Sequence, residues 1–583
     1  MRLKELSKKR KISQLKHECL NLSLNRKRQT VLFLCLFSSI LLTKLIISLK
    51  MVKLIIVRRL TMEKSKKKNG FASGIGFILA AAGSAVGLGN LWGFPYKTAT
   101  YGGAAFVIVY ILCVLLIGSI AMITEIYIGK RSQANTITAF KKVNRNMGWI
   151  GMLAIIIPTF IICYYSVLGG WTVRFAANSF QAIEGANNAN SFGAFISNAY
   201  EPVFYSLIFL AISAIIIMGG VKGGIEKASK VLMPALFIIV VLIAVYSVCL
   251  GGGVGAGLNF YLNPDFSKLG FDGVVAAMGQ AFYSLSLGMG IMIAYGSYTG
   301  EKIKLGKSTL MICVFDTMVA LIAGLAIFSS IGHFNPSAFE EGSGVSLGGV
   351  GLMYQTLPQV FNSLGGFGQV ISFLFFIMVT IAALTSVISL LEVATQFIIQ
   401  KFKVGRKKAT MFLALICFVI SIPVAWSVGG AFDGSIVIFG FDILTFFDEM
   451  TNTVLMPVGA FLSCLVLGWF IEKGTFKKRL NPFNTLRSLE DDGLKLGKFG
   501  KFFVVMLKYV TPLLILFVEV AGIIGKISQE GLKYWWVIVF SVILLGLGVV
   551  LYFIFLRNTE TGCNADEIEI DRALAEKEET LEE

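Results

Sequence analysis

Long apolar segments separated by short polar connections make up most of the chain after Met62. Many run for 18 or more residues, which is long enough for a helix to cross a bilayer. The pattern predicts twelve such spans, at about 72–97, 104–128, 149–178, 202–219, 231–250, 274–298, 309–332, 367–399, 410–427, 442–471, 503–525 and 534–556. We therefore expect an all-α polytopic membrane protein.

Two of these spans are interrupted where a membrane helix should be most regular. The first contains three glycines and an asparagine between Gly83 and Asn90, and the sixth contains serines and paired glycines between Tyr283 and Gly290. In hydrocarbon an unpaired backbone group costs several kcal/mol, so such breaks persist only where they line a polar cavity or bind a ligand. Gly83 and Gly87 also form a G-x-x-x-G pair, which would serve helix packing. Breaks five spans apart favour an inverted-repeat transporter with a binding site near the bilayer midplane.

The distribution of charge predicts the topology and excludes a basic nucleic-acid-binding surface. The net charge is +18, but residues 1–61 hold fifteen Lys or Arg against Glu5 and Glu18, which leaves only +5 for the rest of the chain. Lys and Arg follow spans 2, 4, 6, 8 and 10, whereas the loops 179–201, 333–366 and 428–441 contain none. Because basic loops remain on the cytoplasmic side, both ends of the core are predicted to be cytoplasmic.

The same patterns divide the chain into three parts. Residues 1–61 form a basic extension that we expect to lie outside the core. Residues 62–556 form the core, with repeats at about 72–250 and 274–471 and two extra helices within 503–556, and residues 557–583 form an acidic cytoplasmic tail. The glycine-rich loop 333–366 is either an external gating loop or a passive linker. The nine cysteines show neither metal-ligand spacing nor a disulfide framework.

Several polar residues lie within the predicted spans. An aspartate at bilayer depth costs roughly 2.5–3.5 kcal/mol to insert, so Asp316 is expected to bind a cation, a proton or a partner. Thr385 and Ser386 either bind a ligand or bond back to their own helix, and Tyr165 is equally compatible with packing. We expect structural roles for Glu125, Glu392 and Glu519, and none for His333.

Several motifs, in matching order, carry a family resemblance. Gly83 to Asn90, followed by Leu-Trp-Gly-Phe-Pro95, resembles the first-helix signature of the neurotransmitter:sodium symporter family, and Gln280 to Gly288 resembles its sixth-helix signature. Further matches are Tyr164-Tyr165, Glu125 before Gly129, Ala382-Ala-Leu-Thr385-Ser386 and Phe447-Asp448. The resemblance covers about residues 65–556 and points to the bacterial amino-acid transporter branch.

The resemblance implies sodium-coupled import by alternating access, on twelve helices with a five-plus-five inverted repeat and broken first and sixth helices. It implies one sodium site made by the Ala85 carbonyl, Asn90, Ser284, Asp316 and the substrate carboxylate. A second sodium site would use the carbonyls of Gly83, Val86 and Ala382 and the hydroxyls of Thr385 and Ser386. The substrate carboxylate would meet the amides of Leu88 and Gly89 and the Tyr165 hydroxyl, and the amine would meet the carbonyls of Ala85, Tyr283 and Ser284. The side-chain pocket would comprise Ile161, Ser286, Met289, Ser386 and Leu390.

Three positions restrict the class of substrate and the ions that transport is expected to need. Relatives that carry amines place an aspartate at position 87, so Gly87 favours a substrate that brings its own carboxylate. Met289 replaces a phenylalanine common in relatives and is adaptable, which favours a hydrophobic or aromatic amino acid. Asp316 stands where relatives commonly have asparagine, and its fixed charge predicts chloride-independent transport. No organic cofactor is expected, and the expected location is the cell (inner) membrane.

Two gate positions depart from the family pattern. Gly93 stands where an arginine usually pairs with the aspartate at Asp448, and Lys97, one turn away, is a candidate substitute. Gln400 stands where an aspartate usually pairs with a basic residue near Lys68. A receptor that binds an amino acid without transporting it, and a proton-coupled carrier that uses Asp316, are therefore alternatives. A G-x-S-x-G match at 344–348 lacks the strand–turn–helix context of a hydrolase, so no enzyme is expected.

Overall fold

The structure is a computed structural model, and it describes residues 70–180, 188–300, 303–339, 351–363, 365–429, 436–470 and 500–558. The predicted extension 1–61, the centre of the loop 333–366 and nearly all of the acidic tail lie outside these residues. The division of the chain into an extension, a core and a tail therefore stays a prediction.

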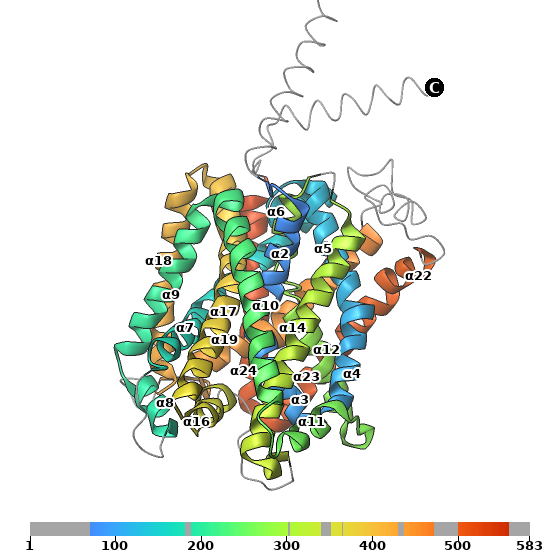
Figure 1. Cartoon of the computed structure of the whole chain (residues 1–583). Coiled ribbons are helices and arrows are strands. Elements are labelled where there is room, and N and C mark those ends of the chain that lie inside the picture. Colours follow the sequence, from blue (N-terminus) through green and yellow to red (C-terminus); the bar gives the residue numbers. More distant parts are fainter. Residues whose placement is uncertain are drawn as a thin grey trace, which may run out of the picture. The chain divides into compact units, whose positions relative to one another are not determined.

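Helices account for nearly all of the described residues, and the membrane-spanning helices run roughly side by side (Figure 1). Those of the first half are α2 (Gly74–Ala85), η1 (Gly89–Gly93), α3 (Phe94–Thr100), α4 (Ala104–Cys113), η2 (Val114–Gly118), α5 (Ser119–Ser132), α7 (Gly148–Ala177), α9 (Glu201–Met218), η4 (Val221–Glu226) and α10 (Lys227–Val248). Those of the second half are α12 (Phe271–Ser284), α13 (Ile291–Ser297), α14 (Leu305–Phe334), α17 (Gly365–Phe402), α18 (Arg406–Ser427), α19 (Ile443–Asp448), η8 (Glu449–Leu455), α20 (Met456–Leu465) and η9 (Val466–Phe470). The chain then continues through α22 (Gly500–Val505), η12 (Met506–Val510), α23 (Thr511–Glu530), η13 (Gly531–Lys533), α24 (Tyr534–Leu551) and η14 (Tyr552–Leu556).

Shorter elements connect the spans. They are η3 (Arg145–Met147), α6 (Thr136–Val143), α8 (Asn188–Ser197), α11 (Val254–Leu262), η5 (Phe266–Lys268), η6 (Pro336–Phe339), η7 (Leu352–Thr356) and α16 (Leu357–Ser363). A short antiparallel pair, β1 (Val437–Ile438) and β2 (Phe441–Asp442), precedes α19, with Val437 opposite Asp442.

Within the described residues, 9 helices are long and apolar enough to cross a membrane, and one bent pair adds a tenth. That number omits two further spans. The stretch Phe502–Leu556 counts as one helix of 55 residues, but such a helix would be about 80 Å long, more than twice the hydrocarbon thickness. Gly531, with φ 66°, divides it between α23 and α24. The sixth span is divided by residues 285–290 into α12 and α13, and neither helix is long enough to be counted by itself. When these two spans are added, the predicted twelve-helix fold is confirmed.

The two broken spans lie inside the bundle rather than at its edge. Helix α2 packs against α10, α14 and α17, while α12 packs against α4 and α23, and α13 packs against α5. Helix α7 contacts α17, α9 and α18. Because neighbouring helices enclose both breaks, non-helical backbone at membrane depth is shielded from lipid, as the physics of the bilayer requires.

Candidate functional site

The first break releases two backbone carbonyls from the helix. Helix α2 ends at Ala85, and the chain resumes as helix at Gly89 after a bend of 49°. The amide of Gly87, which would normally bond the Gly83 carbonyl, donates to Asn90 Oδ1 at 3.1 Å. The amide of Leu88, which would bond the Ser84 carbonyl, donates to the Tyr165 hydroxyl at 3.0 Å. The carbonyls of Gly83 and Ser84 are thus available to other groups.

The second break depends on three residues with positive φ. They are Ser286 (54°), Gly288 (79°) and Gly290 (71°), and a positive φ at a serine is uncommon. A Cβ at Gly288 would collide with the Met456 carbonyl, so only glycine fits this approach to α20. The Glu125 carboxylate accepts the Gly288 amide at 2.8 Å, so this glutamate supports the break itself.

A cavity lies between the two breaks. It is lined by Ser84, Ala85, Gly87, Gly89, Ile161, Tyr165, Tyr283, Ser286, Met289, Ile291, Ser386 and Leu390. Of the predicted substrate-binding residues, only Leu88 and Ser284 are not part of this lining. Ser84 and Ile291 were not predicted; Ser84 belongs to the glycine-rich motif itself, whereas nothing in the sequence distinguishes Ile291 from other apolar residues at a helix start.

Gly87 is the point at which backbone and side chains meet most closely in this cavity. A Cβ on Gly87 would lie 2.6 Å from Ser386 Oγ and 2.9 Å from the Tyr165 hydroxyl. Side chains do not approach a real Cβ so closely. An aspartate at this position would have to displace both groups. The glycine that stands here brings no carboxylate into the cavity.

Three of the residues predicted for the first sodium site form one buried cluster, namely Asn90, Ser284 and Asp316. Asn90 Nδ2 donates to Asp316 Oδ1 at 2.8 Å and to Ser284 Oγ at 3.1 Å, and Ser284 Oγ donates to Asp316 Oδ2 at 2.8 Å. Tyr110 completes the cluster with a hydroxyl 3.2 Å from Ser284 Oγ, a contact that sequence reasoning missed because tyrosine is also common in apolar packing. The amide group of Asn90 faces Asp316 through its nitrogen, so its oxygen would have to turn towards Asp316 to bind a cation.

Four of the residues predicted for the second sodium site lie close together, namely Gly83, Ala382, Thr385 and Ser386. A Cβ on Gly83 would lie 3.2 Å from Thr385 Cβ, so α2 and α17 are in close contact here. Thr385 Oγ1 donates to the Ala382 carbonyl at 3.0 Å, and Ser386 Oγ lies 3.3 Å from the Ser84 carbonyl. Carbonyl and hydroxyl oxygens without sulfur or nitrogen suit a hard cation.

On one side of the cavity, Lys97 contacts Gln280 rather than Asp448. Lys97 Nζ donates to Gln280 Oε1 at 2.9 Å, and Gln280 Nε2 donates to the Gly89 carbonyl at 2.7 Å. In the described part of the chain Asp448 bonds Asn452, and no ion pair joins it to Lys97. The suggested substitute pair is therefore not formed in this structure.

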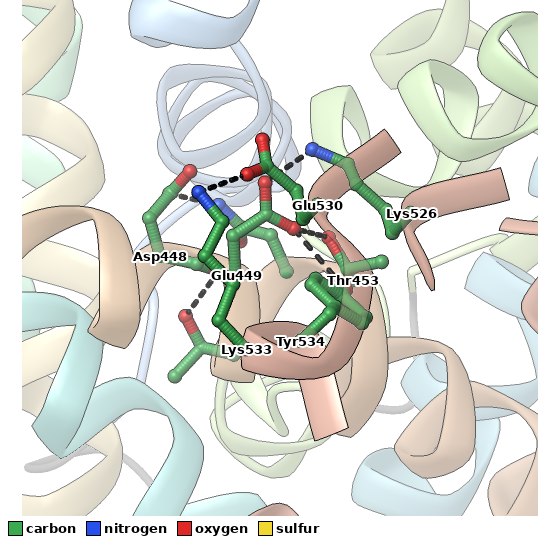
Figure 2. A network of polar contacts seen from close by, with 9 residues as sticks. Asp448, Glu449, Thr453, Lys526, Glu530, Lys533 and Tyr534 are labelled. Atoms are coloured by element: carbon green, nitrogen blue, oxygen red, sulfur yellow. Dashed lines mark hydrogen bonds and ion pairs between the residues drawn. The ribbon is translucent and has the colours of Figure 1, made fainter. Parts of the chain in front are cut away.

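An ion pair that the sequence did not reveal lies next to Asp448. Figure 2 shows Lys526 of α23 with Glu449 of η8, whose carboxylate also accepts from the Thr453 hydroxyl at 2.7 Å and from the Tyr534 hydroxyl at 3.3 Å. This network joins the tenth, eleventh and twelfth spans beside the broken helices.

On the opposite side of the cavity, Gln400 forms hydrogen bonds but no ion pair. Its Oε1 accepts from Asn135 Nδ2 at 2.6 Å. Two turns earlier on α17, Glu392 pairs with Arg406 at 2.6 Å and accepts from the Tyr298 hydroxyl at 2.6 Å. Lys68 lies outside the described residues, and within them Glu392–Arg406 is an ion pair close to Gln400 along the chain. The structural role expected for Glu392 agrees with this geometry.

Comparison with known proteins gives a consistent result. A model of the "Sodium:neurotransmitter symporter family" matches residues 68–193 and 196–559. The sodium-dependent transporter YhdH of Bacillus subtilis is 33% identical over 467 residues, which cover 78% of this chain and 98% of that protein. A sodium-dependent transporter of Methanocaldococcus jannaschii is 28% identical over 506 residues, which cover 83% of this chain and 96% of that protein.

A solved structure agrees with the sequence matches. The crystal structure of MhsT in complex with L-phenylalanine superposes with a TM-score of 0.68 at 34% sequence identity, covering 78% of this chain and 100% of MhsT. The matched region contains both broken helices and the cavity between them. The chain therefore belongs to the sodium:neurotransmitter symporter family and is a multi-pass membrane transporter rather than an enzyme.

Proposed function

We propose that the protein imports a hydrophobic or aromatic amino acid together with sodium ions by alternating access. Family membership supports sodium coupling. The observation that carries the substrate class is the cavity itself, whose lining combines the Tyr165 hydroxyl and freed backbone with the apolar side chains of Ile161, Met289 and Leu390. The relative MhsT was crystallised with L-phenylalanine, a ligand of this class.

The backbone near Leu88 would recognise the substrate carboxylate. Here the Leu88 amide and the Tyr165 hydroxyl bond each other at 3.0 Å, and the hydroxyl keeps its own proton to donate. A carboxylate placed between them would accept from both, replacing one neutral hydrogen bond by two charge-assisted bonds. The Gly89 amide would add a third, and the amine would meet carbonyls of Ala85, Tyr283 and Ser284.

Two sodium ions would occupy the oxygen-rich clusters on either side of this backbone. The first would lie among the Ala85 carbonyl, Asn90, Ser284, Asp316 and the substrate carboxylate. The second would lie among the carbonyls of Gly83, Val86 and Ala382 and the hydroxyls of Thr385 and Ser386. Two ions moving inward release roughly 2.3 kcal/mol each per 100 mV, whereas a tenfold gradient of a neutral zwitterion costs about 1.4 kcal/mol.

The buried carboxylate of Asp316 supports chloride independence. Its oxygens accept from Asn90 and Ser284 within the first cluster, so a fixed negative charge stands beside the first sodium ion. An external anion would then be unnecessary for charge balance. Uptake that collapses when gluconate replaces chloride would contradict this part of the proposal.

The experiment that tests the function is uptake of labelled amino acids by purified protein in proteoliposomes. We expect accumulation of phenylalanine, leucine or tryptophan that requires an inward sodium gradient and stops when the gradient is dissipated. Sodium-dependent binding without accumulation would instead indicate a receptor. Accumulation driven by a pH gradient without sodium would indicate a proton-coupled carrier.

The orientation and the processing of the chain are part of the same proposal. The basic loops support an orientation in which both ends of the core lie on the cytoplasmic side of the cell (inner) membrane. We further propose that residues 1–61 are not part of the mature protein, or at least lie outside its core. Peptides upstream of Met62, found by mass spectrometry of natively expressed protein, would contradict their absence from the mature protein.

A further inference from the structure

Four serine hydroxyls gather where the two breaks meet. Ser84, Ser286 and Ser386 line the cavity, and Ser389 lies directly behind them, fully buried on α17. Ser286 Oγ lies 2.8 Å from the Ser84 carbonyl, and the hydroxyls of Ser84 and Ser389 are 2.7 Å apart. Helices α2 and α17 and the break in the sixth span therefore contribute hydroxyls to one wall of the cavity.

The hydrogen-bond partners determine the direction in which each hydroxyl donates. A serine hydroxyl has one proton to donate and two lone pairs that accept. Ser389 Oγ donates to the Ser386 carbonyl at 2.7 Å, and Ser84 Oγ donates its one proton either to Ser389 Oγ at 2.7 Å or to Ser286 Oγ at 3.4 Å. Ser286 donates to the Ser84 carbonyl, and Ser386 donates to the carbonyl of Ala382 at 3.2 Å or to that of Ser84 at 3.3 Å. All four protons thus go to acceptors of the protein.

In this arrangement the wall therefore offers lone pairs rather than protons to a ligand. The lone pairs of Ser84 and Ser286 are left for whatever occupies the cavity, while those of Ser386 belong to the proposed second sodium site. The other residues at the side-chain end are apolar, namely Ile161, Met289, Ile291 and Leu390. The best occupant is an apolar group that carries a single donor.

We propose that this hydroxyl wall makes the transporter select tryptophan, whose indole N–H donates to the serine oxygens at positions 84 and 286. The inference rests on the proposed function, because it assigns the side chain of the amino acid held in the same cavity. Indole nitrogen is a donor only, so it leaves no unmet acceptor. The tyrosine hydroxyl also accepts, and in this arrangement the wall has no donor to offer it. Phenylalanine and leucine have no donor at all.

The test compares tryptophan with an analogue of the same shape that lacks the donor. In L-3-benzothienylalanine a sulfur atom replaces the indole N–H. A net hydrogen bond of ordinary strength corresponds to about a two- to tenfold difference in affinity. We expect sodium-dependent competition binding to the purified full chain to show tryptophan binding tighter by this factor, with tyrosine weaker than tryptophan.

Two variants locate the effect. Ser286→Ala keeps the Cβ, so the strain of a side chain at φ 54° is unchanged, but it removes the acceptor. The ratio of the affinities for tryptophan and its analogue should therefore fall towards one. Ser84→Ala should reduce the same preference. Ser213→Ala is the matched control, because Ser213 is a buried serine of α9 that donates to the Phe209 carbonyl at 2.9 Å away from the cavity. Its preference should equal that of the wild type.

Each outcome decides between the two proposals. Equal affinities for tryptophan and its analogue in the wild type overturn the inference, as does a preference that survives in both Ser286→Ala and Ser84→Ala. Both outcomes leave amino-acid transport itself intact. If no amino acid binds in the presence of sodium, the proposed function fails and this inference fails with it.

Discussion

Replacing Gly87 by alanine should impair the binding of amino acid and sodium together. The added methyl group would lie 2.6 Å from Ser386 Oγ and 2.9 Å from the Tyr165 hydroxyl, so at least one of these groups must move by several tenths of an ångström. Tyr165 would bind the substrate carboxylate, and Ser386 would bind the second sodium ion. Overpacking of this kind costs about 1–3 kcal/mol, which corresponds to about a 5- to 150-fold loss of affinity.

The assay is equilibrium binding of a labelled amino acid to the purified variant over a range of sodium concentrations. We expect the dissociation constant of the amino acid to rise and half-saturation to require more sodium. Gly522→Ala is the control, because a Cβ at this position in α23 has nothing within 4 Å. A Gly87→Ala protein that binds both ligands as the wild type does would refute the close packing of α2, α7 and α17 around this glycine.

Three further changes test other contacts. Tyr165→Phe removes the group that accepts the Leu88 amide, and we expect amino-acid affinity to fall about tenfold with unchanged circular dichroism; unchanged affinity would contradict the carboxylate site. Asp316→Asn removes the buried charge, and we expect sodium affinity to fall about tenfold or more and uptake to become sensitive to chloride, measured against gluconate. Glu519 is buried, and neither of its carboxylate oxygens has a hydrogen-bond partner, so Glu519→Leu should relieve about 1–3 kcal/mol of desolvation cost and raise the midpoint of thermal unfolding in detergent. A lower midpoint would show that this carboxyl has a stabilising role.

The broken helices could be predicted from sequence because their signal is local. Glycine and small polar residues within an apolar segment mark a place where the helix stops, and the cavity lies at the two places so marked. The spacing of the spans then brought Tyr165, Ser386 and Leu390 to the same cavity, as the family motifs implied.

Contacts between distant helices could not be predicted in the same way. Whether Lys97 reaches Gln280 or Asp448 depends on the rotation and tilt of three helices, which a single sequence does not encode visibly. The pair Glu449–Lys526 poses the same difficulty, since both residues lie near span ends that carry several charges. The direction in which the Asn90 amide faces is also set by its neighbours in space rather than in the chain.

Two hydrogen bonds attach the first break to the sixth span at either end of the interrupted backbone. Ser286 Oγ holds the Ser84 carbonyl, and Gln280 Nε2 holds the Gly89 carbonyl. With both ends held, the two interrupted segments are coupled to each other across the cavity, so a displacement of one would strain these two bonds unless the other followed. Helices α7 and α17 line the same cavity but take no part in these two bonds, so a movement of the coupled segments relative to α7 and α17 would change the shape of the cavity.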